Sequence, residues 1–143
     1  MSAIDVVSDA NVVLKWFHDE GEQEVTEARL LLDAHRERTV ALLVLDLTAY
    51  EVGNALLRGR ANADADQVAI VLEALGEICP SVGLGAEEWR LATELADRHD
   101  LTLYDAAYAA VAKSRKARLA TLDDELLGAG LGTRPGELAR AIF

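Results

Sequence analysis

The chain has 143 residues, and its 25 acidic residues against 14 Lys and Arg give a formal net charge of −11. This length predicts a single domain over residues 1–143, and 51% hydrophobic against 27% charged residues excludes a disordered chain. The excess of acid argues against a protein that coats DNA or binds a membrane surface by charge.

Strands alternate with helices through the first half of the chain. The expected elements, in chain order, are a strand over 4–8, a helix over 12–18, a long charged helix over 22–38, a strand over 40–45 and a helix over 47–57. Asp46 is expected to cap the last of these helices, and Gly59 is expected to end it.

The second half continues this alternation and finishes in a Gly-rich segment. The expected elements are a helix opened by Asp64 or Asp66 and running to about 77, an edge strand over 78–84, a helix over 86–99, a helix over 103–115 capped by Thr102, a strand over 119–122 and a short helix after Asp124. The stretch 128–136 is expected to be a loop, with at most a weak final strand.

Two features bear on where the chain acts. Cys79 is the single cysteine, so an intramolecular disulfide is excluded and a cytoplasmic location is expected. The longest apolar run, over 40–45, is far too short to cross a bilayer, so no membrane partner is expected.

The order of the elements points to one edge of a sheet. Helices between consecutive strands imply right-handed crossovers and a parallel sheet with both faces covered. Such sheets bind ligands beyond the carboxyl ends of their strands. Asp9 and Asp123 follow the ends of two predicted strands, and topology alone therefore makes them the first candidates for a functional site.

The helix over 47–57 carries Glu51, Asn54 and Arg58 on one stripe. This stripe either faces solvent or forms one side of a polar cleft, and the pattern leaves both open.

Asp105 lies in the first turn of its predicted helix, where the helix dipole alone favours a carboxylate. Ala109 and Ala112 share its face. These small side chains either leave Asp105 open to a ligand or allow two helices to pack closely, and both interpretations stand.

Four acids far apart in the sequence thus become candidates for one site: Asp9, Glu51, Asp105 and Asp123, called the acidic quartet below. If they converge, their repulsion is costly unless a cation lies among them, and oxygen ligands favour Mg²⁺ or Mn²⁺. The sequence contains no Cys/His pair at zinc spacing, no Gly-rich phosphate loop and no Ser/His/Asp set.

Four motifs carry these residues. They are Asp9-Ala10-Asn11 after the first strand, Glu51-Val52-Gly53-Asn54, Thr102-Leu103-Tyr104-Asp105-Ala106-Ala107-Tyr108 and Ala120-Thr121-Leu122-Asp123. In order and spacing they resemble the PIN-domain family, and most closely the small VapC-type toxins of prokaryotic toxin–antitoxin pairs. The resemblance spans the chain from the first strand to Asp123 and does not extend to the tail after Leu127.

The resemblance implies a three-layer α/β/α fold, with a central, mainly parallel sheet of four to five strands, and a metal-dependent endoribonuclease. The acidic quartet would be the catalytic set and would hold one or two Mg²⁺ or Mn²⁺ ions. Polar support for the quartet is expected from Asn11, Asn54, Thr102, Thr121 and Asp124.

The resemblance also implies three partners, which are an RNA substrate, a second copy of the chain and a cognate antitoxin whose tail covers the acidic cleft. Two groups of cations at helix ends are expected to contact RNA phosphates: Arg58 with Arg60, and Lys113 with Arg115 and Lys116. Cations also suit the dipole at a helix C-terminus, which is the alternative interpretation of both groups.

Two other functions stay open. A Mg²⁺-dependent phosphatase or phosphotransfer enzyme should carry a second Asp two residues after the first, where this chain has Asn11. A PIN-like fold retained only for binding is the other possibility, and the presence of all four acids argues against it.

Overall fold

Four parallel strands form the central sheet of the computed structural model, which describes residues 3–18, 23–59 and 61–143. The strand order is β3-β2-β1-β4. β1 (Ile4–Ser8) lies in the middle and pairs with β2 (Val40–Leu45) and β4 (Arg118–Ala120), while β3 (Ser81–Val82) is an edge strand. Because every pair is parallel, the carboxyl ends of all four strands meet at one edge of the sheet.

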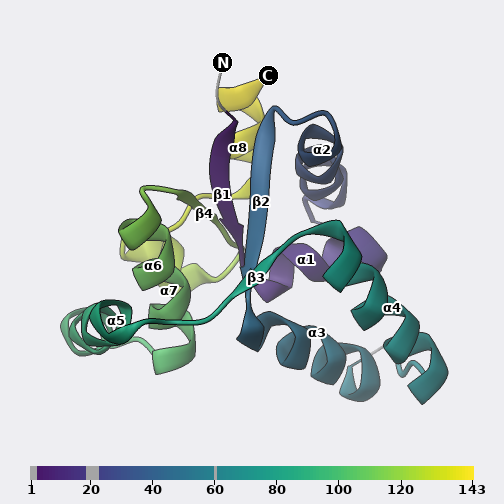
Figure 1. The fold of residues 1–143 in the computed structure, drawn as a ribbon, viewed down its shortest axis with the longest axis horizontal. Helices are drawn as coiled ribbons and strands as arrows, with labels where there is room; N and C mark the ends of the chain where they lie inside the picture. The colour runs from purple at the N-terminus through teal and green to yellow at the C-terminus, as the bar shows by residue number, and fades with distance from the viewer. Residues whose placement is uncertain (1–2, 19–22, 60) are drawn as a thin grey trace.

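Helices cover both faces of this sheet (Figure 1). One layer contains α1 (Ala10–Phe17), α2 (Val25–Arg36), α3 (Asp46–Arg58), α4 (Ala65–Ile78) and α8 (Pro135–Ile142). The other contains α5 (Ala86–His99), α6 (Leu103–Arg115) and α7 (Asp124–Gly128). The predicted three-layer α/β/α fold is therefore confirmed. None of the helices in the described ranges is long and apolar enough to cross a bilayer.

The pleat of the strands divides the core into two halves. Val6 and Leu42 pack with the helices of the first layer, whereas their neighbours Val7 and Leu43 pack with those of the second. Successive side chains of a strand point to opposite faces, so an apolar run such as β2 is buried on both sides. This double burial holds the ends of β1 and β2 in fixed positions.

Two helices begin earlier than the sequence predicts, because side chains near each start bind free N–H groups. α1 begins at Ala10, since Asp9 Oδ1 accepts the Ala10 N–H at 2.7 Å. α3 begins at Asp46, which is therefore a helical residue, and the prediction that it caps this helix is wrong. Leu45 holds the N-cap position, and its N–H donates to Thr48 Oγ1 at 3.1 Å.

Other boundaries also differ from the predictions. The charged helix predicted over 22–38 spans Val25–Arg36, and Glu22 lies outside the described residues. The edge strand predicted over 78–84 is reduced to Ser81–Val82, after a proline that lacks an N–H for pairing. The strand predicted over 119–122 ends at Ala120, because Thr121 turns its side chain to Asp9. The caps predicted at Asp64 and Thr102 are confirmed.

The C-terminal segment contains a helix that the sequence analysis missed. The loop predicted over 128–136 ends at Pro135, the first residue of α8, and the expected final strand is reduced to one bridge between Ala120 and Thr133. Glu24 fixes the start of α8, since Oε1 accepts the Gly136 N–H at 2.8 Å and Oε2 accepts from Arg134 Nη1 at 3.0 Å. These bonds attach α8 to the beginning of α2.

Candidate functional site

Asp9 lies at the carboxyl end of the central strand and is only 5% exposed. Its Oδ1 accepts the Ala10 N–H, and its Oδ2 accepts from the Thr121 hydroxyl at 2.7 Å and from Asn11 Nδ2 at 3.3 Å. The Asp9 N–H donates to the Ala120 carbonyl at 2.9 Å, which joins the ends of β1 and β4. The carboxylate is thus fixed at the edge of the sheet where the strands end.

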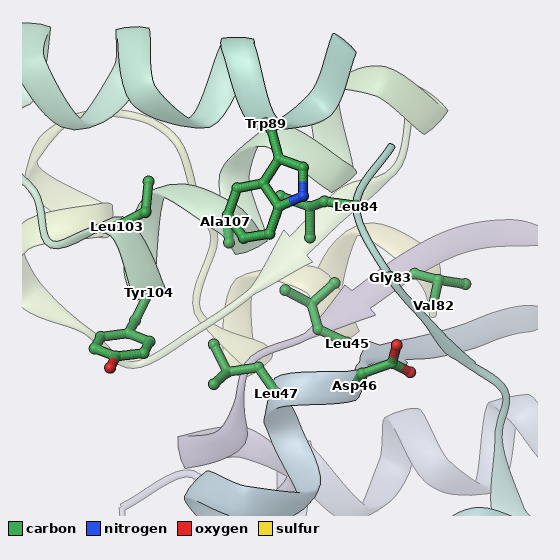
Figure 2. A pocket seen from close by; sticks show the side chains of 10 residues that line it. All are labelled: Leu45, Asp46, Leu47, Val82, Gly83, Leu84, Trp89, Leu103, Tyr104 and Ala107. Atoms are coloured by element: carbon green, nitrogen blue, oxygen red, sulfur yellow. The ribbon is translucent and has the colours of Figure 1, made fainter. Parts of the chain in front are cut away.

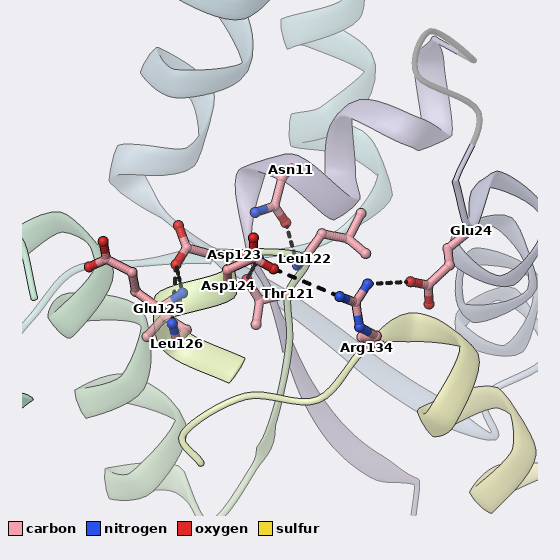
Figure 3. A network of polar contacts seen from close by, with 9 residues as sticks. All are labelled: Asn11, Glu24, Thr121, Leu122, Asp123, Asp124, Glu125, Leu126 and Arg134. Carbon is pink, nitrogen blue, oxygen red and sulfur yellow. Dashed lines mark hydrogen bonds and ion pairs between the residues drawn. The ribbon is translucent and has the colours of Figure 1, made fainter. Parts of the chain in front are cut away.

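Asp123 is positioned by the turn that follows β4. Its N–H donates to Thr121 Oγ1 at 3.0 Å, and its Oδ1 accepts the N–H groups of Glu125 and Leu126 at the start of α7 (Figure 3). The buried Thr121 hydroxyl therefore contacts both Asp9 and the backbone of Asp123. Asn11 completes the turn, because its Oδ1 accepts the Leu122 N–H at 3.1 Å.

Glu51 is a half-buried residue of α3 whose carboxylate is held by a tyrosine of α6. The hydroxyl of Tyr108 donates to Glu51 Oε1 at 2.7 Å and lies 2.7 Å from Thr48 Oγ1. Tyr108 and Thr48 are both fully buried. Burial raises the pKa of Tyr108 far above its usual range, so its hydroxyl stays protonated and acts as a permanent donor.

Asp105 stands in the first turn of α6, which Thr102 begins by accepting the Asp105 N–H at 3.1 Å. Its side chain is half-buried. Ala109 and Ala112 are almost completely buried in the core between α5 and α6. The alanines therefore serve close helix packing, and the binding of a ligand by Asp105 stays a prediction.

The charges of the acidic quartet act on one another. Burial first, and then the charges of Glu51 and Asp105, raise the pKa of Asp9 from 3.8 to about 7 against the opposing hydrogen bond from Thr121. Burial and the charges of Asp123 and Glu51 raise the pKa of Asp105 to about 6. Burial also raises the pKa of Glu51, with Tyr108 opposing the shift. Four residues from four segments thus share one electrostatic site.

Comparison with known proteins identifies the family of this chain. The family model of the PIN domain matches residues 6–130. The chain belongs to the PIN-domain family. It is also 34% identical over 125 residues to Ribonuclease VapC3 of Pyrobaculum aerophilum, with 85% of this chain and 91% of that protein covered. This PIN domain is therefore a homologue of a VapC ribonuclease.

Solved structures share the fold of this PIN domain. The crystal structure of PAE2754 from Pyrobaculum aerophilum has a TM-score of 0.68 at 25% identity, covering 97% of this chain and 95% of that one. A toxin–antitoxin complex from Klebsiella pneumoniae gives 0.66 at 18% identity, covering 91% and 97%. VapC20 of Mycobacterium tuberculosis, described as a sarcin-ricin loop cleaving toxin, gives 0.67 at 15% identity, covering 87% and 95%. The last two likenesses concern the fold alone.

Only some of the residues predicted to support the acidic quartet lie next to its members. Asn11 and Thr121 contact Asp9 directly, and Thr102 caps the helix of Asp105. Asn54 is exposed, so the stripe over Glu51 and Asn54 runs from the site out to solvent. The side chain of Asp124 is 93% exposed and lies 3.8 Å from Arg134 Nη2 (Figure 3). The charge of Asp123, in contrast, raises the pKa of Asp105.

The basic residues lie at the far ends of two helices. Arg58 ends α3 and is exposed, about 10 Å along the axis from Glu51. Lys113, Arg115 and Lys116 end α6, where the chain returns to the start of β4, so they lie toward the opposite edge of the sheet from Asp105. Arg60 lies outside the described residues.

A cavity of about 430 Å³ opens beside the site, but most of the residues that line it are apolar. Its lining comes from the end of β2, the segment 82–84 and the starts of α5 and α6, with Trp89, Leu103 and Tyr104 prominent (Figure 2). Trp89 is 48% exposed, so this apolar wall meets solvent. No member of the acidic quartet lines the cavity, which is therefore unsuited to hydrolysis of a phosphodiester.

The donor set suits a hard divalent cation, because it consists of carboxylates whose charges together raise the pKa of Asp9 and of Asp105. Within the described ranges, no three His, Cys, Asp or Glu side chains stand close enough to hold an ion together directly. Mg²⁺ generally keeps several waters and uses one or two carboxylates, so it does not require such a three-carboxylate group. Asp9 and its neighbours therefore fit a hydrated ion.

Three polar residues of this site escaped the sequence analysis. Tyr108 and Thr48 hold Glu51, and Arg134 lies between Glu24 and Asp124 (Figure 3). One signal was available, since Tyr108 follows Asp105 by three residues and Thr48 precedes Glu51 by three. Residues three apart share a helix face, so both polar side chains could have been assigned to the faces of the two acids.

Proposed function

We propose that this PIN domain is a metal-dependent endoribonuclease that hydrolyses RNA phosphodiester bonds and is the toxin of a toxin–antitoxin pair. One observation carries the proposal. The acidic quartet comes from four separate segments, yet the charges of its members raise the pKa of Asp9 and of Asp105 at the carboxyl edge of a parallel sheet. Homology to a ribonuclease then favours RNA among the possible phosphate esters.

In this proposal the acidic quartet holds one or two Mg²⁺ or Mn²⁺ ions. A bound divalent ion supplies charge for the phosphate and lowers the pKa of its water. Asp9 is the primary ligand, since the hydrogen bonds from Ala10, Asn11 and Thr121 fix its orientation. Thr121 and Asn11 also hold the turn that carries Asp123, so one polar network orients acids from two strands.

The proposal is tested by incubating the purified chain with structured RNA in Mg²⁺, in Mn²⁺ and in EDTA. We expect cleavage with either ion and none with EDTA. We also expect products with 5′-phosphate and 3′-hydroxyl ends, because a metal-bound water makes the 2′-hydroxyl unnecessary as a nucleophile. Cleavage that persists in EDTA, or products with 2′,3′-cyclic phosphate, would contradict the proposal.

The same assay separates the two alternatives. A Mg²⁺-dependent phosphatase or phosphotransfer enzyme would release phosphate from a small monoester and leave the RNA chain intact. A PIN-like binding module would bind RNA in a mobility-shift assay without cutting it in either metal.

The proposed partners are a cognate antitoxin and a second copy of this chain, acting in the cytoplasm. An antitoxin segment that covers the quartet should bring a cation, because four buried or half-buried carboxylates lack a positive partner among the described residues. The apolar wall around Trp89 supports self-association. Light scattering of the purified chain tests the dimer.

Arg58 is expected to contribute to the binding of any RNA substrate. The lysines at the end of α6 are expected to contribute only to the binding of long RNA substrates. Arg58→Ala should raise KM several-fold and reduce the slope of log affinity against log salt by about one, because one phosphate contact is lost. Lys113→Ala combined with Lys116→Ala should raise KM for a long RNA and leave a short oligonucleotide unaffected, since about 16 Å of helix separates Lys116 from Asp105.

Steady-state kinetics with both substrates, at several salt concentrations, measures these effects. Arg36→Ala is the matched control, because this exposed arginine on α2 forms only a surface ion pair with Asp33 at 3.5 Å. Equal effects of all these variants on KM would indicate general charge attraction rather than defined contacts.

A further inference from the structure

A buried chain of hydrogen bonds leads from the end of β2 to the carboxylate of Glu51. It begins at the N–H of Leu45, which donates to Thr48 Oγ1 at 3.1 Å. Thr48 Oγ1 lies 2.7 Å from the Tyr108 hydroxyl oxygen, and that hydroxyl lies 2.7 Å from Glu51 Oε1. Thr48 and Tyr108 are each 0% exposed, so water does not compete for these bonds.

The chemistry of the groups fixes the direction of the chain. Glu51 as a carboxylate only accepts, so the Tyr108 hydroxyl must donate to it. The Tyr108 oxygen is then free to accept from the Thr48 hydroxyl, whose own oxygen accepts from Leu45. Every donor points toward Glu51, and each of these bonds polarises the next. The arrangement leaves neither hydroxyl unsatisfied.

This relay also joins two helices that belong to opposite layers. α3 packs mainly against α1, α4 and β2, whereas α6 packs mainly against α5, β1 and β4. Tyr108 lies on α6 one turn after Asp105. Its side chain reaches α3, where it contacts Glu51, which lies one turn after Thr48. The hydrogen bonds therefore set the position of the Glu51 carboxylate relative to Asp105.

One oxygen of Glu51 remains available. Oε1 is occupied by Tyr108, and within the described part of the chain Oε2 makes no hydrogen bond or ion pair. Glu51 is a long side chain on a half-buried position, which without a fixed partner would sample several rotamers. The tyrosine thus leaves a single, oriented oxygen for a cation or its bound water.

We infer that Tyr108 and Thr48 are positioning residues that hold Glu51 Oε2 ready for the divalent ion and the water of the reaction. This inference rests on the proposed function and adds to it two residues outside the acidic quartet. It assigns Tyr108 no proton transfer, only the orientation of a carboxylate. A partner of this kind typically contributes about 10- to 100-fold to metal affinity or activity.

The experiment compares Tyr108→Phe and Thr48→Val with wild type and with Glu51→Gln. Phenylalanine keeps the buried ring and removes only the hydroxyl, so the fold should persist. We expect Tyr108→Phe to weaken Mn²⁺ binding, measured by calorimetry, about tenfold or more. We expect kcat to fall by a similar factor at limiting Mn²⁺, with KM for RNA unchanged. Thr48→Val should act in the same direction but less, since Tyr108 still donates to Glu51.

Two conservative variants separate positioning from general damage. Thr48→Ser keeps the relay hydroxyl and should restore wild-type Mn²⁺ binding. Tyr50→Phe removes the hydroxyl of a tyrosine that precedes Glu51 on α3 and is 74% exposed, and it should change nothing.

If Tyr108→Phe binds Mn²⁺ and cleaves RNA like wild type while Glu51→Gln loses both, the positioning role is overturned and the proposed function stands. If wild type itself neither binds Mn²⁺ nor cleaves RNA, the proposed function fails. In that case a crystal structure of Tyr108→Phe decides the positioning role. A Glu51 carboxylate in its wild-type place shows that Tyr108 does not orient Glu51 at all, and a displaced or disordered one shows that Tyr108 orients Glu51 but not for a metal ion.

Discussion

Asp9→Asn is expected to lower the rate of metal-dependent RNA cleavage by about 10³-fold while the protein remains folded. Asp9 is the most buried member of the acidic quartet, and its carboxylate is the one that most hydrogen bonds hold in place. Asparagine has the same shape but no charge, so it loses most of the attraction for a divalent ion. Its remaining carbonyl oxygen still accepts the Ala10 N–H, which keeps the start of α1.

Rates should be measured with saturating RNA over a range of Mn²⁺ concentrations. Asp5→Asn is the matched control, because Asp5 is an exposed acid on the same strand. If excess Mn²⁺ restores the rate of Asp9→Asn, the carboxylate acts mainly in binding the ion. A variant that cleaves at the wild-type rate at low Mn²⁺ would show that Asp9 is not part of the nuclease site.

The positions of Asp9 and Asp123 were accessible from sequence because they depend on topology. Both acids follow the last residues of buried strands, and a parallel sheet brings such ends to one edge. The cap at Thr102 was also accessible, because its hydrogen bond to Asp105 spans three residues. Local rules and strand order thus place three of the four acids without knowledge of side-chain packing.

Contacts between distant segments were not accessible in this way. The bond from Tyr108 to Glu51 joins residues 57 positions apart, and no periodicity in either helix indicates the pairing. The start of α8 likewise depends on Glu24, which lies 112 positions away from Gly136. A local signal for α8 did exist, since Pro135 suits the first position of a helix and Leu138 and Ile142 are spaced for one apolar face.

Asp46 shows how a single side chain can shift a boundary. Asp is a common capping residue, and the sequence therefore favoured it over Leu45. The structure instead places Thr48 where its hydroxyl accepts the Leu45 N–H, so the helix begins one residue earlier. The same hydroxyl is a member of the relay to Glu51, which links the start of α3 to the site.

Stability of the metal-free protein is expected to fall as the pH rises from about 4 to about 7. The pKa of Asp9 is raised from 3.8 to about 7 in the folded chain, and that of Asp105 to about 6. In this window the unfolded chain has already lost protons that the folded chain still binds. Raising the pH therefore favours the unfolded state, and the loss is complete once the pH passes the folded pKa. For the buried Asp9 alone the shift corresponds to about 4 kcal/mol.

Thermal unfolding in EDTA at a series of pH values measures this loss, with Asp9→Asn as the comparison. The variant has no carboxyl to ionise, so its melting temperature should decline less with pH. Above pH 7 the melting temperature of the variant should exceed that of wild type. The hydrogen bond from Thr121 is lost in the variant, which reduces its gain in the free energy of unfolding by about 1 kcal/mol. Parallel curves for the two proteins would show that Asp9 does not ionise unfavourably in the folded state.

Mn²⁺ should reverse the order of the two proteins at neutral pH. An ion that binds only the folded state adds about 4.1 kcal/mol at a concentration of 1,000 times Kd, which exceeds the advantage of about 3 kcal/mol that Asp9→Asn has without the ion. The ion adds this stability only where the carboxylates are ionised. Wild type should therefore gain stability with Mn²⁺ above pH 7 and gain little near pH 4, whereas Asp9→Asn should gain little at any pH. The repulsion among the carboxylates thus destabilises the metal-free protein and also gives the site its affinity for a cation. Removing the charge of Asp9 should therefore stabilise the metal-free protein and abolish most of its nuclease activity.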